Sequence, residues 1–74
     1  MEVKIGVQDV SRELVVDTNQ EGDEIEKIVT QALAGNEPVV ALTDTKGRRI
    51  LVPAARVSYV EIGGGVSGQV GFRS

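Results

Sequence analysis

The order in which the apolar side chains change their spacing is the strongest constraint on the fold of this chain. In residues 2–8 and 13–17 apolar and polar side chains alternate, which is typical of half-buried strands. In residues 25–33 the apolar side chains instead recur at helical spacing, at Ile25, Ile28, Val29, Ala32 and Leu33. Further short apolar segments follow. The sequence therefore predicts an amphipathic helix between two groups of strands.

Three strands are predicted after the helix. Residues 39–43 lead into Asp44-Thr45-Lys46-Gly47, which has Asp first and Gly last as a type I turn prefers, and the chain returns in residues 48–52. Pro53 has no N–H to donate, so it is expected to end that strand. Residues 57–62 form the last predicted strand, and the side chains expected to share one of its faces are Ser58, Val60 and Ile62.

The element order ββαβββ predicts an α+β fold with one helix packed on a four- to five-stranded sheet. Placing the last strand beside the first buries both, and this pattern resembles the β-grasp, or ubiquitin-like, fold. We favour that fold over a plain antiparallel sandwich, with a small SH3-like barrel as a third alternative. The domain is predicted to span residues 1–62. Residues 63–74 are predicted to be a Gly-rich C-terminal tail, with an extra strand as the alternative.

The residue types in the chain argue against catalysis and against metal binding. The sequence has no Cys and no His, so it lacks thiolate ligands and the commonest general base near neutral pH. The carboxylates of Asp23, Glu24 and Glu26 are expected in the first helical turn, where they complement the helix dipole. No phosphate-binding loop or nucleophile elbow is present. We therefore expect no enzyme activity, no catalytic residue, no metal site and no cofactor.

The chain starts directly into a strand pattern, without a signal peptide or an apolar segment long enough to cross a membrane. We therefore expect a cytoplasmic protein without a membrane partner. The net charge of −3 and the lack of stacking aromatics argue against nucleic acid as a partner.

Positive charge gathers in the second half of the chain. Guanidinium groups at Arg48, Arg49 and Arg56 could hold a phosphate bidentately, so an adenine nucleotide is the alternative ligand. Strand alternation, however, places Arg48 and Arg49 on opposite faces of the sheet. Salt bridges to Asp44, Glu61 or the acidic helix are the competing, structural role for these arginines.

The favoured function is a non-enzymatic protein-interaction or adaptor domain. Arg49, Leu51 and Tyr59 are predicted to form its contact surface on the sheet face away from the helix, since Tyr and Arg are frequent interface anchors. An edge strand could also pair with another chain. The expected partner is therefore a protein, either of another kind or a second copy in a homodimer.

Four segments are similar to one known family: residues 1–7, 24–26, 47–63 and 70–72. They read MEVKIGV, EIE, GRRILVPAARVSYVEIG and VGF. On these segments the chain resembles a family of small actinobacterial proteins classed as a domain of unknown function. Gly22 departs from the pattern, because a better helix-starting residue is expected there. The resemblance implies a short cytoplasmic protein with no established reaction, although some members carry an ATP-binding label.

Overall fold

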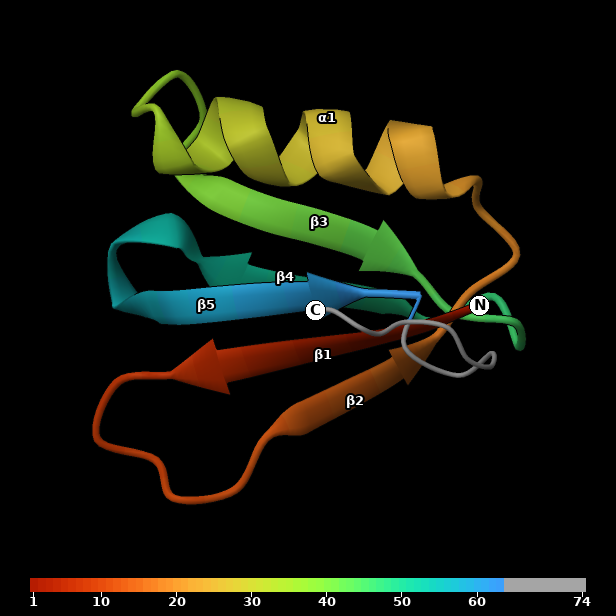
Figure 1. Cartoon of the computed structure of the whole chain (residues 1–74), viewed down its shortest axis with the longest axis horizontal. Coiled ribbons are helices and arrows are strands. Elements are labelled where there is room, and N and C mark those ends of the chain that lie inside the picture. The colour runs from red at the N-terminus through yellow and green to blue at the C-terminus, as the bar shows by residue number, and fades with distance from the viewer. Residues whose placement is uncertain (64–74) are drawn as a thin grey trace, which may run out of the picture.

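The computed structural model describes residues 1–63, in which the chain forms one α-helix and five strands (Figure 1). The elements in chain order are β1 (Glu2–Val7), β2 (Leu14–Asp17), α1 (Gly22–Leu33), β3 (Val39–Thr43), β4 (Arg49–Pro53), the single 3-10 turn η1 (Ala54–Arg56) and β5 (Val57–Ile62). This order confirms the α+β prediction. From Gly64 on, the predicted tail and its alternative extra strand lie outside the described residues.

The strands form two antiparallel sheets rather than one, with the orders β2-β1-β5 and β3-β4. The prediction of a four- to five-stranded sheet is therefore wrong, and the β-grasp arrangement is not confirmed. The prediction that the last strand lies beside the first is confirmed, since β5 pairs with β1 in antiparallel orientation. The sheets separate where Pro53 ends the β4 ladder and η1 turns the chain away from β4.

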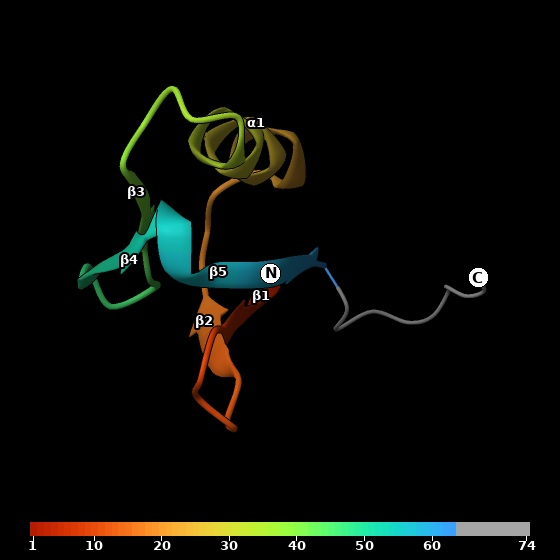
Figure 2. The same cartoon turned by 90° about the vertical axis from the view of Figure 1, so that its left-hand side faces the viewer.

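The two sheets enclose a common core, and α1 covers one of the two seams between them. The helix packs against β3 and β5, so it closes the seam on that side. The opposite seam lies between β2 and β4 (Figure 2). It is joined at one end, where the N–H of Thr45 donates to the carbonyl of Asp17 at 2.8 Å. Both strands along this seam are sheet edges.

Aliphatic side chains from both sheets and from the helix fill the core. The predicted helical stripe is buried at Ile25, Val29 and Ala32, whereas Leu33, at the end of α1, is 53% exposed. The remaining buried apolar side chains are Val3, Ile5, Val16, Val40, Leu42, Val52 and Val57.

A β-bulge changes the predicted faces of β5. Gly6 pairs with Tyr59 but Val7 pairs with Val57, so Ser58 is an extra residue without a partner in β1. Because the bulge reverses the alternation, Val57 faces the core on the side of Val60 and Ile62, where Ser58 had been predicted.

Thr18 links the first sheet to the second. Its side chain is fully buried, and its hydroxyl donates to the Thr43 carbonyl at 2.6 Å and accepts from the Gln20 N–H at 3.1 Å. The helix begins at Gly22 with Glu21 at the N-cap position, and no side chain caps it. Gly22, which departs from the family pattern, is thus the first residue of a helix that no side chain caps.

Candidate functional site

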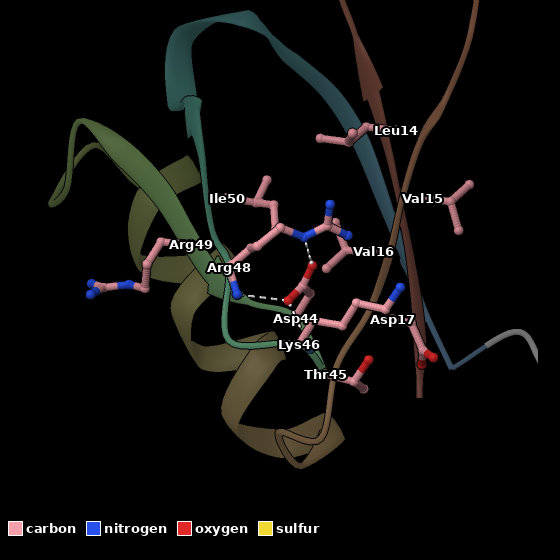
Figure 3. Close-up of a pocket in the computed structure, with 10 residues that line it drawn as sticks. All are labelled: Leu14, Val15, Val16, Asp17, Asp44, Thr45, Lys46, Arg48, Arg49 and Ile50. Carbon is pink, nitrogen blue, oxygen red and sulfur yellow. Dashed lines mark hydrogen bonds and ion pairs between the residues drawn. The ribbon is translucent and has the colours of Figure 1, made fainter.

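A groove of about 520 Å³ follows the open seam between β2 and β4 (Figure 3). Leu14 and Val16 point into it from β2, and Ile50 points into it from β4. Alternation along β2 sends the Val15 side chain to the opposite side of the strand. The groove is therefore apolar along its floor. The charged residues that line it are Asp17 of β2, Arg49 of β4, and Asp44, Lys46 and Arg48 of the β3–β4 turn.

The buried carboxylate of Asp44 organises that turn. Its side chain is 7% exposed, and its Oδ1 accepts hydrogen bonds from the N–H groups of Lys46 at 2.9 Å and Arg48 at 2.8 Å. Its Oδ2 accepts from Nε of Arg48 at 2.7 Å. Burial alone would raise the pKa of Asp44, but the bonds from Arg48 and Lys46 outweigh it and hold this pKa below its usual value. Asp44 is thus a structural carboxylate, poorly suited to accept a proton.

The three arginines of the alternative nucleotide site lie apart. Arg48 crosses the groove beside Asp44, whereas Arg49 points away from it (Figure 3). Arg56 follows the far end of β4, about 13 Å along the strand at 3.3 Å per residue, and its Nη1 is 4.0 Å from the Asp9 carboxylate. The geometry therefore provides no three-arginine cluster for a phosphate. It agrees with the predicted salt bridge from Arg48 to Asp44, whereas Arg56 pairs with Asp9, which was not among the predicted partners.

Arg49 and Leu51 lie together on the outer face of β4. Leu51 is 62% exposed and pairs with Ala41 of β3, which puts both side chains on one face. Next to them, a second groove of about 450 Å³ lies between α1 and β3, lined by Lys27, Ile28, Gln31, Glu37, Val39 and Ala41. We call the surface formed by Ile28, Val39, Ala41, Arg49 and Leu51 the outer patch.

Tyr59, predicted to share a surface with Arg49 and Leu51, lies in the other sheet. Its ring covers Gly6 of β1, and its hydroxyl donates to a carboxylate oxygen of Glu13. This hydrogen bond is the main cause that raises the pKa of Tyr59, and burial and the charges of Glu13 and Glu61 add to it. Tyr59 is thus engaged inside its own domain, and the predicted residues belong to two surfaces rather than one.

The seam was not predicted from the sequence. Leu14 and Val16 line it because β2 is an edge strand with β4 across the gap. A hairpin strand at the start of a small chain is a candidate edge, and this was the available signal.

Within residues 1–63, no three side chains of His, Cys, Asp or Glu are grouped as a metal site would require. The helix of this part of the chain is too short and too polar to span a membrane.

Comparison with known proteins gives one positive result. A family model described as "Protein of unknown function (DUF3107)" matches residues 1–73. A search of the curated proteins gave no match. The match covers nearly the whole chain and agrees with the resemblance seen in the sequence. The chain therefore belongs to the DUF3107 family of proteins of unknown function.

Proposed function

We propose that this protein is a non-enzymatic, cytoplasmic protein-interaction domain that contacts its partner through the outer patch. The observation that carries the proposal is the position of Leu51, which is 62% exposed opposite the small side chain of Ala41. The patch continues across β3 to Ile28 and the groove beside α1. An exposed apolar area of this kind, rimmed by charged side chains, is typical of a binding surface.

The energetics favour a buried role for Leu51 in a complex. Fully burying one leucine side chain contributes about 1.5–3 kcal/mol. Arg49 stands beside it, and within residues 1–63 its guanidinium takes part in no ion pair. An arginine next to an apolar anchor can bind a partner carboxylate with two parallel hydrogen bonds.

The ionisable side chains with shifted pKa values support a non-enzymatic role. The pKa of Asp44 is lowered and the pKa of Tyr59 is raised, so each moves away from the neutral range that acid–base catalysis uses. Both groups are held by hydrogen bonds within the domain, Asp44 to Arg48 and Tyr59 to Glu13.

Affinity capture with two matched variants tests the proposal. Leu51→Ser removes the apolar centre of the outer patch, and Leu33→Ser changes a leucine of similar exposure, 53%, at the end of α1. The proposal predicts a protein captured by the wild type and by Leu33→Ser but lost with Leu51→Ser. Capture that is equally strong with Leu51→Ser, or a strictly monomeric protein that captures nothing above background, would contradict it.

A further inference from the structure

We propose that the open seam between β2 and β4 binds an extended acidic segment of a partner protein, which adds to β2 as a further strand. The inference rests on the proposed function because it names the chemistry of a bound partner, but it uses a different surface. It is carried by the free backbone groups of β2, by the apolar floor of the groove and by the charges at its rim.

The hydrogen-bond pattern shows which backbone groups of β2 are free. Met1 and Thr18 exchange two bonds, from the Thr18 N–H to the Met1 carbonyl and from the Met1 amino group to the Thr18 carbonyl, both at 2.9 Å. In an antiparallel pair, successive residues point their backbone groups to alternate sides. The backbone N–H and carbonyl groups of Val15 and Asp17 therefore point away from β1, as the bond from the Thr45 N–H to the Asp17 carbonyl confirms.

Three backbone groups of β2 thus face the seam without a partner among the described residues: the N–H and carbonyl of Val15 and the N–H of Asp17. The same alternation applies to β4, because the Asp44 N–H donates to the Arg48 carbonyl at 2.8 Å. The backbone groups of Arg49 and Leu51 therefore point away from β3, on the side of the seam. An extended segment in the gap would find hydrogen-bonding groups on both sides.

The side chains that line the seam suit alternate apolar positions of a strand. Leu14, Val16 and Ile50 point into the groove, whose volume of about 520 Å³ lies within the range of ligand-binding clefts. An added strand would direct every second side chain onto this floor. The main-chain bonds would contribute affinity and the floor would select apolar side chains.

The cations at the rim of the groove favour an acidic segment as its ligand. The carboxylates nearest the groove already have cations: Asp44 has Arg48, and Asp17 has the Met1 amino group at 3.5 Å. Arg48 uses Nε for Asp44, and its side chain is 74% exposed. Lys46, which also lines the groove, forms no ion pair within residues 1–63. The cations left for a ligand are therefore Lys46 and the outer nitrogens of Arg48.

Peptide binding to the full chain tests the proposal. The probe is a blocked peptide of about six residues, the length of a common strand, in which valine alternates with glutamate. The matched peptide has lysine in place of glutamate. Chemical shifts and amide hydrogen exchange of the labelled protein report where each peptide binds.

Val15→Pro is the informative variant, because the N–H of Val15 takes no part in the ladder with β1. Proline at such an edge position removes a donor from the seam and leaves the β1–β2 bonds in place. Val15→Thr keeps the N–H and is the control. If Val15→Pro does not fold, the exchange rates of the wild-type Val15 and Asp17 amides decide the question.

The expected result is slower exchange at Val15 and Asp17 and shifts at Lys46 with the glutamate peptide. We expect binding to weaken about tenfold with the lysine peptide and about tenfold with Val15→Pro, since each loses at least one strong contact. Equal affinity for both peptides, or no change with Val15→Pro, overturns the proposal.

Two other occupants of the seam would each give a distinct result, and either result overturns the proposal. Protection of the Val15 and Asp17 amides in the free monomer means that the chain covers its own edge, and protection that grows with protein concentration means that a second copy does. If no peptide binds but capture depends on Leu51, only the proposal of strand addition at β2 is contradicted. If the peptide binds but capture does not depend on Leu51, the proposal that the outer patch contacts the partner is contradicted instead.

Discussion

The ring of Tyr59 lies across Gly6 of the neighbouring strand, so close that a Cβ on Gly6 would clash with Cε2 of the ring. The two residues are directly paired in the β1–β5 register. An aromatic side chain that covers a glycine in the adjacent strand shields its backbone from water and stabilises the pairing. This contact also directs the Tyr59 hydroxyl to Glu13, in the connection between β1 and β2.

Gly6→Ala is predicted to displace the Tyr59 ring and to destabilise the domain by about 1–3 kcal/mol, as overpacking typically does. Urea unfolding measures the change. In a Tyr59→Ala background the same substitution should cost much less, because the clashing ring is absent. An equal cost in both backgrounds would show that the ring is not the reason for glycine at this position.

Tyr59 should ionise above the usual tyrosine pKa of about 10, because its hydroxyl donates to the Glu13 carboxylate. Since the folded-state pKa is raised, the associated stability is present below pH about 10 and is lost as the pH rises through the higher value. The chain has a single Tyr and no Trp, so tyrosinate absorbance reports this residue alone. Glu13→Gln should return the pKa towards its ordinary value; an unchanged titration would contradict the assigned cause.

Asp44 should make the domain sensitive to acid. Its folded-state pKa is lowered, so its contribution to stability is present above the ordinary aspartate value of about 3.9 and is lost as the pH falls through the lower folded value. Asp44→Asn should therefore be less stable than the wild type at neutral pH, with a gap that narrows in acid. Unfolding at several pH values measures this gap. Asp9→Asn, at a side chain that is 91% exposed, is the control and should show little change.

Thr18→Val should destabilise the domain by about 1–3 kcal/mol, because it leaves the Thr43 carbonyl and the Gln20 N–H without the Thr18 hydroxyl in a buried place. Thr30→Val makes the same chemical change on the exposed side of α1 and should stay within about 0.5 kcal/mol. Denaturant midpoints compare the two variants. Similar midpoints would mean that the Thr18 hydroxyl does not join the sheets.

Local patterns in the sequence predicted the elements well, because the signals for them lie within a few residues. The stripe at Ile25 and Val29, the turn after Asp44 and the strand end at Pro53 are all of this kind. The opposite directions of Arg48 and Arg49 followed from strand alternation in the same way.

The division into two sheets could not be predicted, because it depends on contacts between residues far apart in the chain. The bond from the buried Thr18 hydroxyl to the Thr43 carbonyl spans 25 residues, and no local pattern predicts it. The bulge at Ser58 shifts β5 by one residue, which alternation alone does not reveal. The separation of Tyr59 from Arg49 and Leu51 follows from the same division of the sheets.

An NMR titration of the labelled protein with the captured partner tests directly whether the outer patch is the contact surface. We expect the largest shift changes to cluster at Leu51, Ala41 and Ile28, and we expect Leu51→Ser to abolish them while Leu33→Ser preserves them. Shift changes centred on Gly6 and Tyr59, or a cluster at the outer patch that survives Leu51→Ser, would contradict it.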